Sequence, residues 1–112
     1  MLFRSSVRRG EVFHLAPGRG RRGSEQSGPR YGVVVQADEL LALSTVVIAP
    51  TSASALPATF RPEITISRRR TRVLVEQLGA VDPARLGRSA GLLQPEDIRA
   101  IDEALTVVLG LS

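Results

Sequence analysis

The apolar residues of this chain are grouped in short runs, separated by polar connections rich in glycine and proline. Runs at 11–15, 33–36 and 45–49 predict strands, and the β-branched residues of the last two indicate that they are buried. Pro50 is expected to end the third strand. Moderate alternation at 59–67 fits an edge strand, 73–78 is expected to be a buried strand, and 86–93 a short strand or turn. Long loops are expected at 16–29 and 52–57, and a helical turn or connector at 38–43.

The clearest helical signal lies near the end of the sequence. Pro95 fits the first position of a helix, where Glu96 and Asp97 would favour the positive end of the helix dipole. Apolar residues then recur at helical spacing, at Ile98, Ile101, Leu105 and Val108. Gly110 fits the stop. Short strands followed by one helix indicate a mostly β fold with α: a small, mostly antiparallel sheet that is twisted or barrel-like.

The composition sets further limits. The length fits a single domain over residues 1–112, in which 1–8 is expected to be a loose N-terminal arm. Without cysteine there is no disulfide and no thiolate metal site, and a single histidine argues against a histidine-built metal centre. No apolar stretch reaches about 18 residues, so no membrane span is expected. The first residues lack the long apolar segment of a secretory signal. We therefore expect a cytoplasmic protein with no metal and no cofactor.

All fifteen basic residues are arginine, and the net charge is +4. Residues 1–30 carry a net +5 and residues 61–72 a net +4, whereas 31–60 and 73–112 are acidic. A GC-rich genome would account for this use of arginine, but arginine also suits phosphate binding and base stacking, so both explanations stay open. If the fold joins the two basic segments, the resulting face would favour nucleic acid or an acidic protein segment.

Three residues near predicted strand ends are candidates for chemistry. Arg30 either closes a loop at the surface or stabilises charge on a phosphate; its permanent protonation excludes a classical base role. Glu25 is either a loop acid, solvated or paired with Arg30, or a general base for a ribose 2′-hydroxyl. Thr51 is either a turn residue or a hydroxyl that orients a phosphate oxygen.

Other side chains in the same loops are candidates for binding RNA. The polar ones are Ser24, Gln26, Ser52 and Gln77, of which Gln77 would read a base edge through its amide. The basic ones belong to a segment similar to arginine–glycine loops that contact RNA backbones, and are Arg19, Arg21 and Arg22. This segment lacks the strand–turn–helix context of a dinucleotide site. His14 lies in the first predicted strand, where a structural role is the simpler interpretation.

The ordered set of short motifs resembles a known family. The motifs are Arg9-Gly10-Glu11-Val12, Gly23-Ser24-Glu25-Gln26 with Arg30 before Val33-Val34-Val35, Val46-Val47-Ile48-Ala49-Pro50-Thr51-Ser52, Leu56-Pro57, Val75-Glu76-Gln77-Leu78, Val81-Asp82, and Ile101-Asp102-Glu103-Ala104-Leu105 with Leu109-Gly110-Leu111. Together they resemble the MazF/PemK (Kid) endoribonuclease toxins of bacterial type II toxin–antitoxin pairs, over about residues 9–111.

The resemblance implies a CcdB/PemK-like fold, which is a twisted sheet or SH3-like barrel with a C-terminal helix, and a homodimer. It implies sequence-selective, metal-independent cleavage of single-stranded RNA, in which 2′-hydroxyl attack leaves 2′,3′-cyclic phosphate and 5′-hydroxyl ends. Arg30 and Thr51 match the family's catalytic pair, and Glu25 matches a functionally sensitive glutamate. Ser24 and Gln77 match positions that contact RNA. A cognate antitoxin is the implied protein partner.

Three departures from the family pattern affect specificity, the first being a loop before Gly23 that is a few residues longer and richer in arginine. Tyr31 replaces the usual proline after the arginine, and Leu78-Gly79-Ala80 replaces Ile-Arg-Thr, which removes one basic contact. These changes leave the reaction class intact but put the cleavage sequence in doubt, because base choice lies in such loops. Two alternatives stay open: a non-enzymatic protein of the gyrase-poisoning type, which shares this general fold, and an inactive copy that only binds antitoxin.

Overall fold

Strands make up most of the regular structure in the computed structural model, which describes residues 7–16 and 30–111. This part of the chain forms seven strands, three short 3-10 helices and one α-helix. They are β1 (Glu11–Leu15), β2 (Tyr31–Val34), η1 (Asp38–Leu40), β3 (Val46–Ser52), β4 (Glu63–Ile66), β5 (Arg69–Val73), η2 (Val75–Gln77), β6 (Gly79–Val81), η3 (Pro83–Arg85), β7 (Leu86–Leu92) and α1 (Pro95–Val108).

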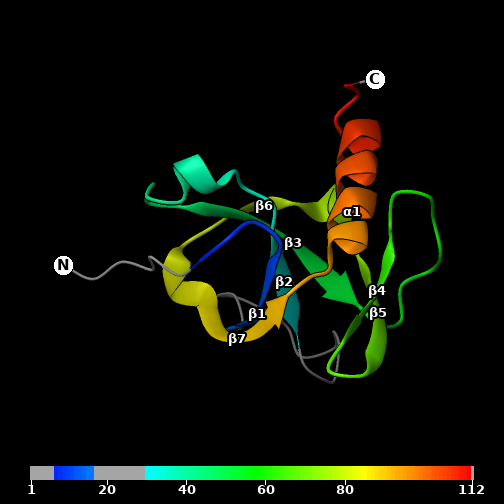
Figure 1. Ribbon diagram of the computed structural model, residues 1–112, viewed down its shortest axis with the longest axis horizontal. Coiled ribbons are helices and arrows are strands. Elements are labelled where there is room, and N and C mark those ends of the chain that lie inside the picture. The colour runs from blue at the N-terminus through cyan, green and yellow to red at the C-terminus, as the bar shows by residue number, and fades with distance from the viewer. Residues whose placement is uncertain (1–6, 17–29, 112) are drawn as a thin grey trace.

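The central strand of the sheet is β3. The strand order is β4-β5-β3-β2-β1-β7, with β6 also paired to β3, and every pairing is antiparallel. The first part of β3 lies between β2 and β6, and its last two residues pair with β5. The sheet curls into a half-barrel around β3, where this strand changes its pairing partners, and α1 lies beside the sheet (Figure 1). The predicted fold, a twisted antiparallel sheet with a C-terminal helix, is confirmed.

Two apolar clusters lie on opposite faces of the sheet. The larger one packs between the sheet and α1 and includes Val33 and Ile101. The smaller one includes Val34 and Val7. Val33 and Val34 serve different clusters because successive side chains of a strand point to opposite faces. Only 8% of the Val7 surface is exposed, so this residue of the expected loose arm is packed, while 1–6 lie outside the described residues.

Helix α1 confirms the helix predicted from Pro95 onward. The helix ends beside Gly110, the residue predicted to stop it, which adopts a φ of +68°. The Gly110 N–H donates to the Val107 carbonyl at 3.2 Å, and the Leu111 N–H donates to the Thr106 carbonyl at 2.9 Å. These two bonds form a Schellman motif, which satisfies carbonyls left open by the helix end. No helix in the described residues has the length and apolarity needed to cross a membrane.

The structure corrects several strand boundaries. Strand β3 continues past Pro50 to Ser52. Proline is tolerated there because its carbonyl alone is used, accepting the Leu74 N–H at 2.8 Å. The buried strand predicted at 73–78 is wrong, because β5 ends at Val73 and η2 follows. The arginine-rich run forms β5 instead, and β4 is the edge strand but begins only at Glu63. The strand predicted at 33–36 lies at 31–34.

Candidate functional site

The ends of β2 and β3 meet at Gly32 and Pro50, which lie opposite each other in the antiparallel ladder. Arg30 lies two residues before Gly32, and Thr51 follows Pro50, so the structure brings both backbones to one end of the sheet. Arg30 is half-buried, and its carbonyl accepts the Leu15 N–H at 2.9 Å. Because Arg30 lies outside the regular strand, strand alternation does not set the direction of its side chain.

Thr51 lies between two neighbouring strands. It pairs with Val73 of β5, and only 7% of its surface is exposed. One further step of the β2–β3 register places Tyr31 on its other side. Within the described residues, the Thr51 hydroxyl makes no hydrogen bond. A fixed hydroxyl with free hydrogen-bonding capacity is suited to contact an oxygen of a bound molecule.

Tyr31 and His14 form an aromatic pair at the start of β2. They lie opposite each other in the β1–β2 ladder, with ring centroids 4.9 Å apart and ring planes at 47°. The Tyr31 side chain also packs against the larger apolar cluster, and the residue is half-buried. His14 therefore has the structural contact that its place in a strand predicted, and its ring supports the single tyrosine of the chain beside Thr51.

Ser52 and Gln77 lie next to the same part of β3. Ser52 is the last residue of the strand, and its Oγ is 3.4 Å from the Oγ of Ser54. Gln77 is exposed at the end of η2, which packs against both β3 and α1. Its backbone N–H donates to the Leu74 carbonyl at 2.9 Å, and Leu74 is itself bound to Pro50. The predicted residues Arg30, Thr51, Ser52 and Gln77 thus come from one region of the fold.

The other predicted site residues lie in 17–29, outside the described residues. They are Glu25, Ser24, Gln26, Arg19, Arg21 and Arg22. Their roles stay predictions. Arg30 is the described residue that directly follows this segment in the sequence.

Arg61 and Glu76 form a salt bridge that joins the β3–β4 connection to η2. No sequence motif predicted this pair. The Arg61 Nε and Nη2 donate to the same Glu76 oxygen, Oε2, at 3.0 and 2.7 Å. A third donor, Nη1, reaches the Leu56 carbonyl at 3.2 Å. The hydrogen bonds from Arg61 to Glu76 lower the pKa of Glu76 below its ordinary value, although burial acts in the opposite direction.

The second oxygen of Glu76, Oε1, is buried and has no partner within the described residues. Arg72 extends the arrangement, since its guanidinium donates to the Arg61 carbonyl at 3.0 Å and to Glu63 at 3.2 Å. Contacts of Arg61, and of Glu63 at the start of β4, therefore hold the end of the β3–β4 connection in place, close to Gln77. Arg61 and Glu76 are 15 positions apart, in the β3–β4 connection and in η2, a separation that carries no periodic signal.

The described groups at this end of the sheet are a guanidinium, two hydroxyls, an amide and an aromatic ring. Guanidinium and hydroxyl groups are suited to bind a phosphate, and an amide and a ring are suited to contact a base. Within the described residues, no group of three or more His, Asp or Glu side chains that could hold a metal ion is found. The arrangement is thus suited to recognise a phosphodiester.

Comparisons with known proteins identify relatives along nearly the whole chain. Residues 8–109 match the model of the family described as PemK-like, MazF-like toxins of type II toxin–antitoxin systems. A protein of Mycobacterium tuberculosis described as a candidate toxin, Rv3098A, is 36% identical over 106 residues, which is 94% of this chain and 99% of the relative.

Solved structures share the fold at low sequence identity. An endoribonuclease solved with its cognate antitoxin, from a mycobacterial species, has a TM-score of 0.79 and 18% identity, covering 96% of this chain and 98% of its own. The M. tuberculosis toxin MazF-mt6 has a TM-score of 0.73 and 14% identity, covering 91% and 98%. MazF in a MazE–MazF structure from Deinococcus radiodurans has a TM-score of 0.70 and 19% identity, covering 95% and 97%.

Proposed function

This chain belongs to the PemK-like, MazF-like toxins of type II toxin–antitoxin systems, and from that premise we propose that it is an endoribonuclease that cuts single-stranded RNA at selected sequences. The observation that carries the proposal is the Gly32–Pro50 pairing, which places Arg30 and Thr51 at one end of the sheet. Both residues match the catalytic pair expected from the family motifs. Proteins of the same fold include endoribonucleases.

The proposed reaction is an internal transfer of the phosphoryl group. The ribose 2′-oxygen forms a bond to the adjacent phosphorus while the bond from phosphorus to the 5′-oxygen breaks. The 2′-hydroxyl proton leaves to a base, and a proton is added to the 5′-oxygen. The products are a 2′,3′-cyclic phosphate and a 5′-hydroxyl, so atoms balance without a water molecule or metal ion in this step.

Arg30 and Thr51 stabilise the transition state in this proposal. Negative charge grows on the phosphate oxygens, and the Arg30 guanidinium offers permanent positive charge and several N–H donors there. The fixed Thr51 hydroxyl orients one of these oxygens. A preorganised donor of this kind contributes about 10²–10³ in rate.

Glu25 is the proposed base for the 2′-hydroxyl. A free glutamate has a pKa of about 4.3 and is therefore a weak base at neutral pH. Pairing with Arg30 would weaken it further, since an opposite charge favours the ionised form. Electrostatic stabilisation by Arg30 and Thr51 is then the larger contribution to the rate.

Tyr31 and Gln77 are the proposed base contacts. RNA bases are commonly recognised by stacking on aromatic rings and by hydrogen bonds to their edges. The Tyr31 ring is backed by His14 at 4.9 Å, and Gln77 is exposed beside β3. Because Tyr31 replaces the proline usual in the family, we expect base preference at this position to differ from that of typical relatives.

We also propose a cognate antitoxin and a homodimer. Relatives of the same fold have been solved with antitoxins. In this proposal, an acidic, partly disordered tail of the antitoxin covers Arg30. Disordered segments are suited to this because they can wrap large surfaces. Inhibition that survives removal of this tail would contradict that mode of binding, and a sedimentation experiment that gives only monomers would contradict the homodimer.

The proposed function is tested by incubating the purified protein with long single-stranded RNA in EDTA and mapping the product ends. We expect discrete cuts with cyclic phosphate ends, and no cuts in a matched substrate with 2′-deoxyribose at the mapped sites. Intact RNA across several unrelated substrates would contradict the proposal. A stable complex with DNA gyrase in that case would favour the gyrase-poisoning alternative.

A further inference from the structure

Arginine occupies four of the five positions from 68 to 72, but the four side chains have different surroundings. Arg72 is engaged by Glu63 and by a backbone carbonyl. The Nε of Arg70 lies 3.5 Å from Glu63. Arg68 and Arg69 are exposed, and neither has an ion pair within the described residues. The charges of Arg68 and Arg69 are therefore available to an external anion.

The register places Arg69 on the same face of the sheet as Thr51. Thr51 pairs with Val73, so their side chains share a face. Along β5, Val73, Thr71 and Arg69 point to that face, whereas Arg70 and Arg72 point to the other, where they meet Glu63. Arg69 lies four residue steps before Val73 along the strand, which corresponds to about 13 Å.

The turn that presents Arg68 is strained. Ile66 and Arg69 pair directly, which leaves Ser67 and Arg68 as a two-residue hairpin loop. Their φ angles are +52° and +68°, so both residues are left-handed. Loops of this kind favour Asn-Gly, because most side chains are strained at positive φ. Residues strained in this way cluster at functional sites, which makes Arg68 a candidate for a binding role.

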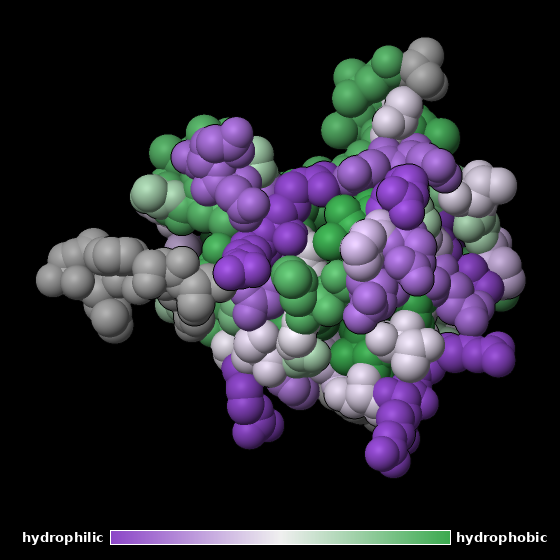
Figure 2. Space-filling view, in the orientation of Figure 1, coloured by the Kyte–Doolittle hydropathy of each residue, from purple (hydrophilic) through white to green (hydrophobic). Residues whose placement is uncertain are grey.

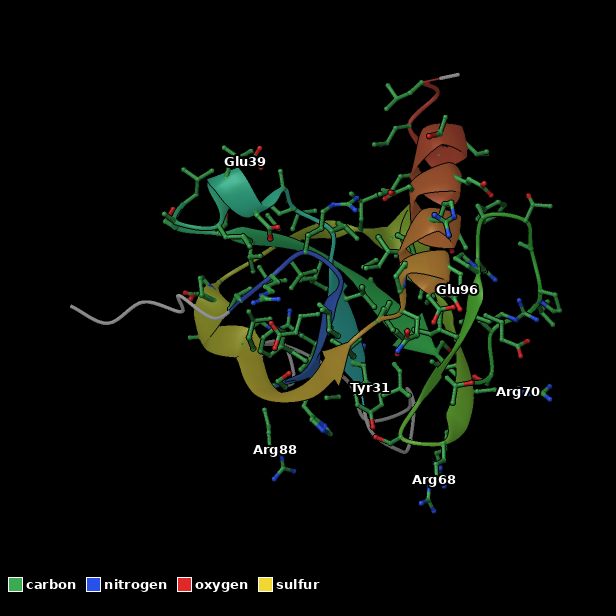
Figure 3. The ribbon with its side chains drawn as sticks, viewed as in Figure 1. Tyr31, Glu39, Arg68, Arg70, Arg88 and Glu96 are labelled. Atoms are coloured by element: carbon green, nitrogen blue, oxygen red, sulfur yellow. The ribbon has the colours of Figure 1, made fainter. Side chains whose placement is uncertain are left out.

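The surroundings of the tip favour a polyanion over a protein segment. Among the described residues, the large exposed apolar side chains lie outside the β4–β5 hairpin, at Leu40, Leu43, Leu56, Leu92, Val107, Leu109 and Leu111. Protein partners usually require such anchors at the centre of an interface. Figure 2 shows strongly polar side chains projecting from the lower edge, and Figure 3 shows Arg68 pointing away from the body of the protein there.

We propose that Arg68 and Arg69 form a phosphate-binding tip that holds single-stranded RNA beyond the scissile phosphate. This inference rests on the proposed function, since it assigns the tip to the same substrate. Contacts with phosphates do not depend on base identity, so the tip adds affinity for any sequence and leaves the choice of cleavage site to the residues around Thr51. Release of counterions makes this affinity depend on salt.

The test measures binding of fluorescent 2′-O-methyl oligonucleotides of two unrelated sequences, which cannot undergo 2′-hydroxyl attack. Arg69→Gln and Arg68→Gly should each weaken binding about five-fold for both sequences, and reduce the slope of log affinity against log salt by about 0.7. Arg99→Gln, an equal charge change at an exposed position on α1, should leave affinity nearly unchanged.

Two turn variants separate strain from charge. Ser67→Asn and Arg68→Gly should both raise Tm, because both favour the left-handed turn. Ser67→Asn keeps both arginines and should bind RNA like the parent. The proposal is supported if both variants have a higher Tm but only Arg68→Gly binds RNA more weakly. A purely structural role of Arg68 would not predict weaker binding by a more stable protein.

Equal affinity of the parent, Arg69→Gln and Arg68→Gly for both oligonucleotides would overturn the proposal, even if the parent cleaves RNA. Unchanged RNA binding together with lost binding of poly-L-glutamate would overturn it in favour of an acidic protein segment. Binding of 2′-O-methyl RNA that depends on Arg68 and Arg69, in a protein that does not cleave RNA, would support the tip while contradicting the proposed nuclease activity.

Discussion

Gly32 of β2 lies directly opposite Pro50 of β3, and this pair sets the relative position of Arg30 and Thr51. Apolar side chains fill the space beside Gly32. A Cβ at Gly32 would lie 3.1 Å from the Ile48 Cδ1 and 3.1 Å from the Leu15 Cδ1. The space beside this glycine is thus tightly packed next to the proposed site.

Gly32→Ala is expected to lower the free energy of unfolding by about 1–3 kcal/mol, because the added methyl overpacks this contact. RNA cleavage should fall as well, since the displaced strand begins directly after Arg30. Gly79→Ala is the control, because nothing lies within 4 Å of a Cβ at that position. Urea denaturation measures both effects on stability, and equal stability of the two variants would contradict the packing argument.

Glu76→Gln is expected to destabilise the protein at neutral pH, because it removes the charged partner of Arg61. Since the pKa of Glu76 is lowered in the folded state, chiefly by hydrogen bonds from Arg61, its contribution is present above the ordinary glutamate pKa. The contribution is lost as the pH falls through the lower, folded value. The difference in stability between parent and variant should therefore shrink in acid.

Urea denaturation of the parent and Glu76→Gln across an acid series measures this difference. Asp97 titrates in the opposite sense, since burial, reinforced by Glu96, raises its pKa. Its contribution is common to both proteins and cancels in the comparison. A difference that stays constant with pH would show that the pair is not what Glu76 contributes.

Tyr31→Leu is expected to raise KM for RNA by about ten-fold or more, because base stacking on an aromatic ring contributes about 1–3 kcal/mol. The value of kcat should change little, since the ring is not proposed to contact the reacting atoms. Tyr31→Phe keeps the stacking surface and should resemble the parent. Steady-state cleavage of a defined oligonucleotide gives both constants, and a fall in kcat alone would contradict a binding role.

The sequence was sufficient to predict β1 and α1, because local signals agree there. Pro95, Gly110 and the helical spacing of apolar residues are each visible without tertiary information. By contrast, β5 is mostly arginine, and it forms a strand because Thr71 and Val73 are buried while its outward arginines meet Glu63. Such partners lie in other elements, so local propensity does not reveal them.

The motifs predicted roles for Arg30 and Thr51, but not how the strands position these residues. Continuation of β3 past Pro50 depends on the Leu74 N–H, which comes from a separate segment. The Arg61–Glu76 pair likewise joins a loop residue to η2, two segments that have no sequence pattern in common. Both features depend on tertiary contacts, which explains why sequence patterns did not predict them.

The most direct test of the proposed cleavage site compares Thr51→Val with Thr51→Ser in single-turnover cleavage of RNA. Valine keeps the shape of this buried side chain but removes the hydroxyl, whereas serine keeps the hydroxyl. We predict that Thr51→Val lowers the cleavage rate about 10²–10³-fold while binding of 2′-O-methyl RNA persists, and that Thr51→Ser retains most of the activity. Equal rates for Thr51→Val and the parent would contradict the assignment of the site.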